Sequence, residues 1–170
     1  TDFLKMGAYT MAVSTLSYND SAATYNSRGL LYKMYRDHFG TIPVDVSGNS
    51  PQPAPKYPPY GDQPKTSSGS PTYPLDMVAA LTADRKYLTI AVVNGTDSYQ
   101  KFDLTVAGMR ATGPATRWEL TGKDLDSENR VGDSPQVSVR ETSMDEKPGS
   151  ISVPAISVDI YRFPVTPTGQ

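Results

Sequence analysis

The chain has 170 residues, which is enough for one domain of ordinary size or for one small domain with an attached piece of another. Its formal net charge of -2 and its scattered Lys and Arg residues give no reason to expect nucleic acid or an anionic membrane surface as a partner. The chain has no cysteine and one histidine, His38, which argues against disulfides, thiolate sites and His-based metal clusters.

The chain begins at Thr1 with helix-like sequence and has neither an initiator methionine nor a signal peptide. No apolar run approaches the roughly 20 residues that a membrane-spanning helix needs, so we expect no membrane partner. We therefore expect a piece of a longer protein, and both a cytoplasmic and a secreted location remain open.

The N-terminal part of the chain predicts the order helix, strand, loop, helix. In residues 1–12 small and apolar side chains recur at helical spacing, and Thr1 or Asp2 supplies a helix cap. Residues 13–18 contain the β-prone side chains of a short strand, and residues 19–24 are expected to form a polar loop.

A second helix is expected from Ser27 to Phe39. Asn26 or Ser27 can cap its first turn, and Gly40 lies where a left-handed residue often ends a helix. We expect His38 to interact with the dipole at the C-terminal end of this helix rather than to act in catalysis. The apolar stripe of the helix is Leu30, Leu31, Met34, Tyr35 and Phe39.

Residues 48–74 are rich in proline, which fixes φ and lacks a backbone donor, so this segment can be neither a helix nor a central strand. We expect an extended connector. Its tyrosines Tyr57, Tyr60 and Tyr73 are unusual in a solvated tether. A flexible linker and an ordered strap that packs on a neighbouring surface therefore both remain open.

After Pro74 the sequence consists of short β-prone runs between turn signals. Their number and spacing predict a β-sandwich rather than a parallel sheet, and alternating apolar residues give each strand one solvated face. Residues 83–86 and 94–97 are expected to be hairpin turns. The seven expected strands are residues 75–82, 87–94, 101–106, 116–120, 136–141, 150–153 and 156–163.

Several blocks of residues carry a resemblance to a known family. They are Leu4–Met6, the segment that ends at Tyr18, Gly29–Gly40, Ala91–Asn94, Arg117–Gly122 and Val153–Pro164. In this order they resemble the C-terminal part of family 51 glycoside hydrolases, the α-L-arabinofuranosidases. In that family a (β/α)8 catalytic barrel is followed by a β-sandwich of jelly-roll type.

The resemblance implies a mainly β fold class, in which a jelly-roll-type β-sandwich follows an α/β remnant of a (β/α)8 barrel. Residues 1–47 would then be the end of the barrel, residues 48–74 the connector, and residues 75–166 the C-terminal sandwich. Within the barrel end, the two expected helices would be the seventh and eighth barrel helices, and the strand between them would be the eighth barrel strand.

The resemblance also implies that this chain carries no catalytic residue. Retaining glycosidases need two carboxyl groups about 5 to 5.5 Å apart, and in the family both are glutamates that follow earlier barrel strands. We therefore expect the chain alone to be inactive and to need no cofactor and no metal. Its own glutamates, Glu119, Glu128, Glu141 and Glu146, are expected to be solvated surface charges.

Substrate contacts are expected only from the loop after the eighth barrel strand, because barrel enzymes bind substrate at the C-terminal ends of their strands. In the family the end of this loop contributes a polar side chain to the sugar pocket. Asn26 and Ser27 occupy the matching stretch, so they are the candidate substrate-binding residues. Helix capping also explains the same two residues, and we favour it over a substrate contact.

Two features of the expected sandwich admit a binding role. Trp118 with Tyr99 or Tyr161 could form a sugar-stacking platform, although a lone tryptophan on a strand is more often part of a core. The acidic run at residues 123–129 lacks the glycine and glutamate spacing of a calcium loop, so we expect a solvated loop.

The sequence therefore predicts the C-terminal part of a retaining enzyme that removes terminal arabinofuranosyl groups from arabinoxylan or arabinan, with a structural role for this chain. The partners would be the arabinofuranosyl-containing oligosaccharide or polysaccharide, through the parent enzyme, and the rest of the barrel. The apolar stripes of the barrel end lack those barrel partners here, so we expect docking on the barrel or self-association into a homo-oligomer. A non-catalytic carbohydrate-binding module and an interaction domain are the alternatives.

Overall fold

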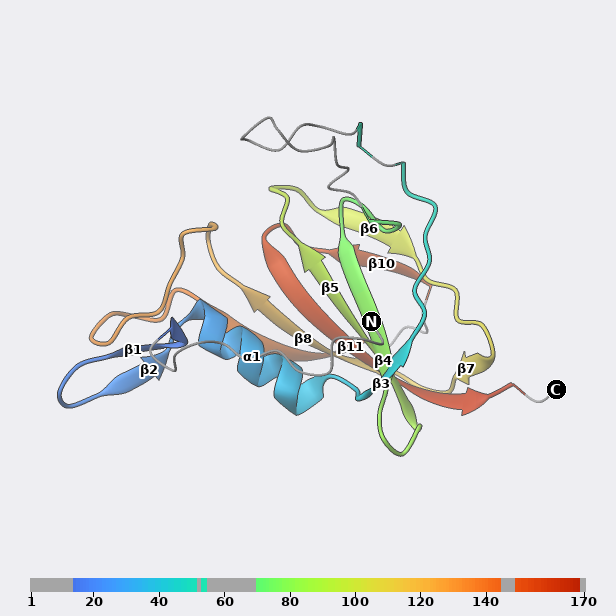
Figure 1. Cartoon of the computed structure of the whole chain (residues 1–170), viewed down its shortest axis with the longest axis horizontal. Helices are drawn as coiled ribbons and strands as arrows, with labels where there is room; N and C mark the ends of the chain where they lie inside the picture. Colours follow the sequence, from blue (N-terminus) through green and yellow to red (C-terminus); the bar gives the residue numbers. More distant parts are fainter. Residues whose placement is uncertain (1–13, 52, 55–69, 145–148, 169–170) are drawn as a thin grey trace, which may run out of the picture.

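The computed structural model describes residues 14–51, 53–54, 70–144 and 149–168, and Figure 1 shows their arrangement. The helix expected over residues 1–12 and most of the connector, with Tyr57 and Tyr60, lie outside the described residues. Two short strands, β1 (Leu16–Tyr18) and β2 (Ala23–Tyr25), precede the helix α1 (Ser27–His38). The later strands are β3 (Ile42–Val44), β4 (Asp76–Leu81), β5 (Tyr87–Asn94), β6 (Gln100–Asp103), β7 (Met109–Ala111), β8 (Ala115–Thr121), β9 (Ser138–Met144), β10 (Ser150–Val153) and β11 (Ser157–Pro167).

Strands β5 and β11 form the centre of a seven-stranded sheet. The strand order is β3-β4-β5-β11-β8-β9, and β7 pairs with the far end of β11. Every strand pair of the described residues is antiparallel. The two central strands are rich in β-branched and aromatic residues and are buried along most of their length, because both faces of the sheet are covered there. The predicted mainly β, antiparallel class is confirmed.

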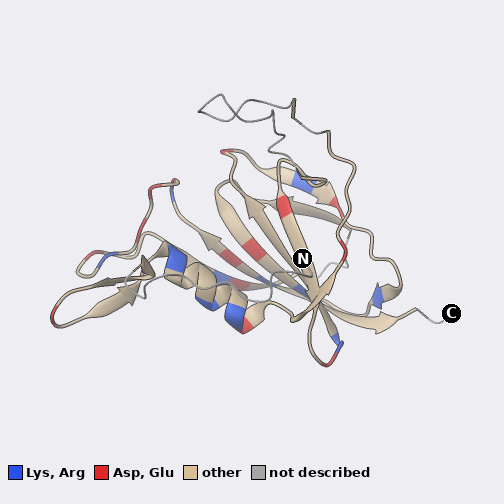
Figure 2. Cartoon of the chain, in the orientation of Figure 1, with Lys and Arg blue, Asp and Glu red and all other residues tan. Residues whose placement is uncertain are grey.

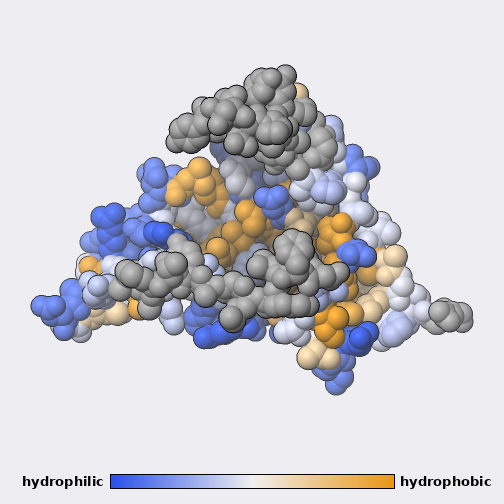
Figure 3. All heavy atoms as spheres, viewed as in Figure 1, coloured by the Kyte–Doolittle hydropathy of each residue, from blue (hydrophilic) through white to orange (hydrophobic). Residues whose placement is uncertain are grey.

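A small second sheet covers one face of the large one. Strands β6 and β10 pair with each other, and their apolar side chains meet those of β5 and β11, which gives the two facing layers expected of a sandwich. The jelly-roll type stays a prediction. In Figure 3 apolar atoms gather over the middle of the face that is shown, and hydrophilic atoms lie at its corners. The core between the layers includes Leu88, Ile90, Val92, Phe102, Ile151, Val153, Tyr161 and Phe163.

Helix α1 covers the opposite face of the large sheet. Its buried Met34 packs with Trp118 of β8 and Ile160 of β11, and the rest of its expected apolar stripe packs against the same cluster. The expectation that this stripe lacks a partner within the chain is therefore wrong. Figure 2 shows Lys and Arg residues along the helix. No helix among the described residues has the length and apolar content that would be needed to cross a bilayer.

Three strands were not predicted from the sequence, and each is only three residues long. Strand β2 lies in the segment expected to be a polar loop, and it pairs with β1 in a hairpin. Strand β3, which contains Pro43, adds to the large sheet beside β4. Strand β7 pairs with Val165–Pro167 at the end of β11. Elements this short have too few residues to display a period of two.

The start of α1 follows the prediction and its end does not. Asn26 is the N-cap, but the C-cap is Phe39 in extended conformation, and Gly40 has no positive φ. Gly40 is instead needed for a close approach, because a β-carbon there would lie 2.5 Å from the carbonyl oxygen of Leu81. Its amide also donates a hydrogen bond to Thr89 Oγ1 at 2.8 Å. The chain is thereby fixed to the large sheet directly after the helix.

The chain turns at both predicted places, but only the first turn joins a hairpin, because β5 and β6 lie in different sheets. In the turn between β4 and β5, Arg85 adopts a φ of 58° and Asp84 accepts hydrogen bonds from neighbouring groups. In the second turn Asn94 is buried, and its side-chain oxygen accepts from the backbone and the hydroxyl of Thr96. Its side-chain amide donates to the carbonyls of Ser98 and Pro154, which ties the end of β5 to the connection between β10 and β11.

Gly29 in the first turn of α1 provides a test of how closely the helix approaches the hairpin. Alanine normally stabilises a helix by about 1 kcal/mol relative to glycine. Here its β-carbon would lie 2.1 Å from the carbonyl oxygen of Thr15, so we expect Gly29→Ala to lower the free energy of unfolding by about 1–3 kcal/mol. Gly95→Ala, where no atom lies within 4 Å, should change it by less than about 0.5 kcal/mol. Urea unfolding measures both, and a stabilised Gly29→Ala variant would show that the approach is looser.

Candidate functional site

The hairpin of β1 and β2 leads directly into α1 and contains the predicted substrate loop. Its turn is closed by Asn19, whose side-chain oxygen accepts hydrogen bonds from the amides of Ser21 and Ala22. Directly paired residues of the two strands share a face, and the face that carries Tyr18 and Tyr25 is exposed. The hairpin therefore presents aromatic side chains on the side away from Ser17 and Thr24.

Asn26, the first candidate substrate-binding residue, is buried and bonded to the backbone at both ends of its amide. Its oxygen accepts from the amide of Gly29 at 3.0 Å, and its nitrogen donates to the carbonyl of Ser14 at 3.1 Å. Asn26 thus fixes the angle between the hairpin and the helix. Ser27, the second candidate, is the half-buried first residue of α1. A substrate contact by either residue stays a prediction.

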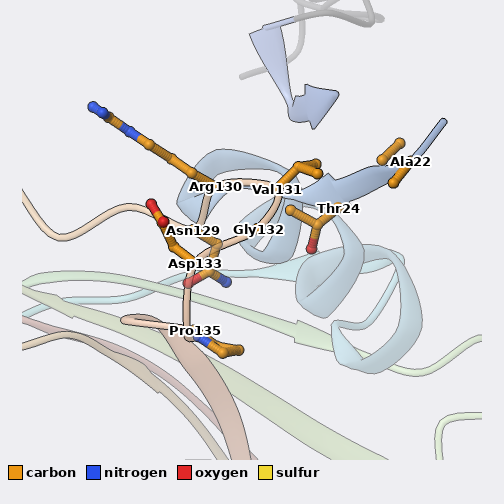
Figure 4. Close-up of a pocket in the computed structure, with 9 residues that line it drawn as sticks. Ala22, Thr24, Asn129, Arg130, Val131, Gly132, Asp133 and Pro135 are labelled. Atoms are coloured by element: carbon orange, nitrogen blue, oxygen red, sulfur yellow. The ribbon is translucent and has the colours of Figure 1, made fainter. Parts of the chain in front are cut away.

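A recess of about 240 Å³ lies between the hairpin and the long loop that joins β8 to β9. The two segments are connected by a hydrogen bond from the amide of Val131 to Ser17 Oγ at 3.0 Å. In Figure 4 the side chain of Arg130 extends away from the hairpin residues. Main chain and small side chains therefore provide most of the lining, which is Ala22, Ala23, Thr24, Asn129, Arg130, Val131, Gly132, Asp133 and Pro135.

Asn129 holds this loop in place, a role that no pattern in the sequence indicated. Its side-chain oxygen accepts from the amides of Gln136 and Val137, and its side-chain amide donates to the carbonyl of Val137. Earlier in the loop, Ser127 is buried and bonds to both the amide and the carboxylate of Asp124. The acidic run is thus an ordered loop closed by its own side chains.

The most prominent group of carboxylates lies on the sandwich side of the large sheet. Glu119 of β8 and Asp159 of β11 are register partners, and Arg117 forms an ion pair with each of them. Arg140 of β9 reaches Glu119 from the surface at 2.9 Å. Glu119 and Asp159 are both buried, so the expectation that Glu119 is a solvated surface charge is wrong. The four side chains form one chain of alternating charge.

Burial decides the electrostatics of this ion network. It raises the pKa of the Asp159 carboxyl, and the guanidinium of Arg117 acts in the opposite direction. It also raises the pKa of the Tyr161 hydroxyl, which has no hydrogen-bond partner among the described residues. Asp159 and Tyr161 are fully buried, and Arg117 occupies the space between the two carboxylates. A retaining mechanism requires the sugar to lie between two carboxyl groups, and Arg117 leaves no room for a sugar between Glu119 and Asp159.

The other glutamates do not form a second pair in the described structure. Glu141 accepts a hydrogen bond from Trp118 Nε1 at 2.8 Å. Glu128 lies between Arg28 and Arg130, at 3.8 Å and 3.7 Å. Glu146 lies outside the described residues.

The aromatic side chains considered for a sugar platform are not on one surface. Trp118 is only 3% exposed and Tyr161 is fully buried, whereas Tyr99 is 75% exposed in the turn between β5 and β6. Trp118, which both versions of the platform require, thus belongs to the core, and so does Tyr161. His38 lies in the C-terminal turn of α1, as expected, and its ring stacks on Trp118.

Comparison with solved structures finds the same fold in arabinofuranosidases. No family sequence model matches the chain, and no curated protein matches it by sequence. A crystal structure of an arabinofuranosidase matches 88% of this chain with a TM-score of 0.68 and 19% identity, and this covers 31% of that protein. The α-L-arabinofuranosidase of Thermotoga maritima, in complex with arabinose, matches 87% with a TM-score of 0.67 and 18% identity, which again covers 31% of its chain.

A family 51 arabinofuranosidase from Xanthomonas axonopodis pv. citri is similar over 88% of this chain, with a TM-score of 0.61 and 14% identity. The match covers 28% of that protein. The chain thus spans less than a third of the length of these similar structures. At this identity the likeness establishes a shared fold, and the resemblance noted in the sequence is confirmed at that level.

Arg117→Met tests the ion network. We expect it to lower the free energy of unfolding at neutral pH by about 3–5 kcal/mol, because Glu119 and Asp159 stay buried without their shared counter-charge. The folded-state pKa of Asp159 is already above its unfolded value, so proton uptake stabilises the folded variant as the pH falls. The loss should therefore be smaller at about pH 4.

Arg140→Met is the matched control for this experiment, because its exposed guanidinium pairs with one carboxylate of the described structure, that of Glu119. It should cost no more than about 1 kcal/mol. Urea unfolding at both pH values provides the measurement. Equal losses for the two variants would mean that the buried pairs contribute no more than the exposed one.

Asn26→Ala tests the capping role. Loss of the side chain removes one hydrogen bond to the first turn of α1 and one to Ser14, so we expect a loss of about 1–2 kcal/mol in unfolding free energy. Ser27→Ala, one residue later, should cost less because Ser27 is not the cap. Thermal and urea unfolding followed by circular dichroism would measure both, and an unchanged Asn26→Ala variant would argue against capping as the reason for this residue.

Proposed function

We propose that this chain is the C-terminal part of a retaining α-L-arabinofuranosidase, in which it has a structural rather than a catalytic role. The observation that carries the proposal is the shared fold with three arabinofuranosidases, each of which is matched over less than a third of its length. The parent enzyme would remove terminal arabinofuranosyl groups from arabinoxylan or arabinan. Its two catalytic glutamates would lie in the part of the protein that precedes this chain.

The extent of the match supports a role at the junction of two domains. Residues 75–166, the proposed sandwich, are little more than half of the chain, so a match over 88% has to extend well beyond the sandwich. The hairpin of β1 and β2 and the helix α1, at residues 16–38, would be the last β/α unit of the catalytic barrel. Strand β1 has only β2 as a partner among the described strands, which leaves its other edge for a barrel strand.

Helix α1 would connect the barrel to the sandwich. One side of it packs on the large sheet through Met34, and the exposed Tyr18 and Tyr25 on the hairpin add apolar surface next to it. An isolated two-stranded hairpin is marginally stable in water, so further contacts from the barrel would support it. The hairpin, including Asn26, would then lie at the rim of the substrate site with its conformation fixed by α1 and by the loop of Asn129.

The alternative of a carbohydrate-binding module receives no support from the aromatic side chains. A sugar-stacking platform needs exposed aromatic faces, and Trp118 and Tyr161 are buried. The carboxylates of the ion network, Glu119 and Asp159, are likewise buried, so no saccharide could reach them. A bracing role needs neither an exposed aromatic platform nor an accessible charged group, because it depends on the two packed faces of the large sheet.

The proposal predicts a difference in activity between this chain and its parent protein. The purified chain should release no 4-nitrophenol from 4-nitrophenyl α-L-arabinofuranoside above the buffer rate, because Glu119 and Asp159, the carboxylates that lie together in the described structure, are buried and both paired to Arg117. The longer polypeptide, isolated from its source with intact mass and N-terminal sequence determined, should hydrolyse it with retention of configuration.

Two controls make this experiment decisive. Glu128→Gln and Glu141→Gln in the longer polypeptide should leave the rate within about twofold, because these residues would lie outside the catalytic site. Activity of the isolated chain that either substitution abolishes would contradict the proposal. A longer polypeptide that hydrolyses no arabinofuranoside would contradict it as well.

A further inference from the structure

The pattern asparagine, any residue except proline, then serine or threonine occurs twice in the chain. One copy begins at Asn19 and ends at Ser21, and the other begins at Asn94 and ends at Thr96. The asparagine of such a pattern is the acceptor of N-linked glycans, which are bulky and need a place on the protein surface. The sequence alone does not distinguish the two copies.

The two copies have the same local conformation. In each, the side-chain oxygen of the asparagine accepts hydrogen bonds from the backbone amide and the hydroxyl of the residue two positions later. For Asn19 these bonds come from Ser21, at 3.0 Å and 3.1 Å. For Asn94 they come from Thr96, at 3.1 Å and 2.7 Å. Each turn therefore holds the required hydroxyl beside the asparagine amide, and the surroundings of the amide nitrogen distinguish the two sites.

The amide nitrogen of Asn94 is not accessible in the folded chain. Asn94 is only 1% exposed, and its Nδ2 donates hydrogen bonds to the carbonyls of Ser98 at 2.9 Å and Pro154 at 2.6 Å. A glycan replaces one of the two protons on this nitrogen, so a buried carbonyl would lose its donor. The first sugar would also need space where the chain is packed. A chain glycosylated at Asn94 therefore cannot adopt this fold.

The amide nitrogen of Asn19 has the opposite surroundings. Residues 19–21 are all exposed in the turn between β1 and β2, which projects at the left edge of the molecule in Figure 1. The bonds that close this turn, from Ser21 and from the amide of Ala22, all go to the side-chain oxygen of Asn19. Its nitrogen donates no hydrogen bond within the described part of the chain. A glycan on this nitrogen therefore costs no hydrogen bond and needs no space inside the fold.

We propose that Asn19 is an N-glycosylation site and that Asn19, not Asn94, carries the glycan of the folded protein when the chain passes through a secretory pathway. The donor is an oligosaccharide linked through pyrophosphate to a polyprenol lipid, and an oligosaccharyltransferase of that pathway acts on it. A bond forms between Asn19 Nδ2 and the anomeric carbon of the first sugar. The bond from this carbon to the pyrophosphate oxygen breaks, its electron pair leaves with the lipid pyrophosphate, and the nitrogen loses one proton. The proposal is independent of the proposed glycosidase function.

Secretion of the full chain from yeast, behind a cleaved signal sequence, tests the proposal. We expect an intact mass that exceeds the mass of the polypeptide by one glycan, and loss of this excess on treatment with a peptide N-glycosidase. Trypsin separates the two sites, because Asn19 falls in the peptide of residues 6–28 and Asn94 in that of residues 87–101. Release of the glycan in ¹⁸O-labelled water converts the modified asparagine to labelled aspartate. We expect the label at residue 19 alone.

Matched variants separate the acceptor from the pattern around it. Asn19→Asp keeps the oxygen that closes the turn but lacks the amide nitrogen, so the glycan should be absent. Ser21→Ala removes the required hydroxyl and should also abolish the glycan, whereas Ser21→Thr keeps the hydroxyl and should remain glycosylated. Thr96→Ala destroys the second copy of the pattern and leaves Asn94 in place, so the single glycan should be unchanged.

Three results would overturn the proposal. The first is an unmodified residue 19 in both the wild-type chain and Ser21→Thr. The second is a glycan that persists in Asn19→Asp. The third is a glycan on Asn94 in secreted chain that circular dichroism shows to be folded. Chain that the cells retain is digested in the same way, so that modification of residue 19 is measured even where export is poor.

Discussion

The antiparallel pairing of β5 with β11 is the interaction on which the other parts of the structure depend. It runs from the pair Ser157 and Asn94 to the pair Pro164 and Tyr87, and it sends successive side chains to opposite faces of the sheet. One face receives the sandwich core and the other receives α1. A slip of one residue would exchange the two sets, so that apolar side chains of the core would face the helix and the ion network would lose its partners.

The ion network shows how this register is reinforced by charge. A buried ion pair seldom adds net stability, because desolvation of the charges offsets their attraction, but a wrongly paired buried charge is strongly unfavourable. Asp159, Glu119 and Arg117 satisfy one another only when β8 and β11 are aligned as they are here. The network therefore acts mainly against alternative alignments. The rings of Tyr161 and Trp118 nearby add packing, one on each face of the sheet, without depending on a charge.

The sequence predicted the elements whose local pattern is long enough to be distinctive. Strand β5 and helix α1 could be located because one has a continuous β-prone run and the other has an N-cap and a helical apolar stripe. The burial of Glu119 could not be predicted, because it depends on β8 lying between β9 and β11, which bring Arg140 and Asp159 beside it. The partner of α1 was missed for the same kind of reason, since the cluster around Trp118 forms only after the strands have paired.

The position of β11 in the sheet has a consequence for the order in which the fold can assemble. During synthesis the hairpin of β4 and β5 is made first and the pair of β8 and β9 follows, but these two units share no edge. They become one sheet only when β11, the last of the described strands to be made, inserts between β5 and β8. Such non-local pairing is slow, and two strand edges stay open until it is complete. A nascent chain at this stage therefore has a period in which β5 and β8 are both available to foreign strands, and the cell has to protect it from aggregation until β11 has emerged.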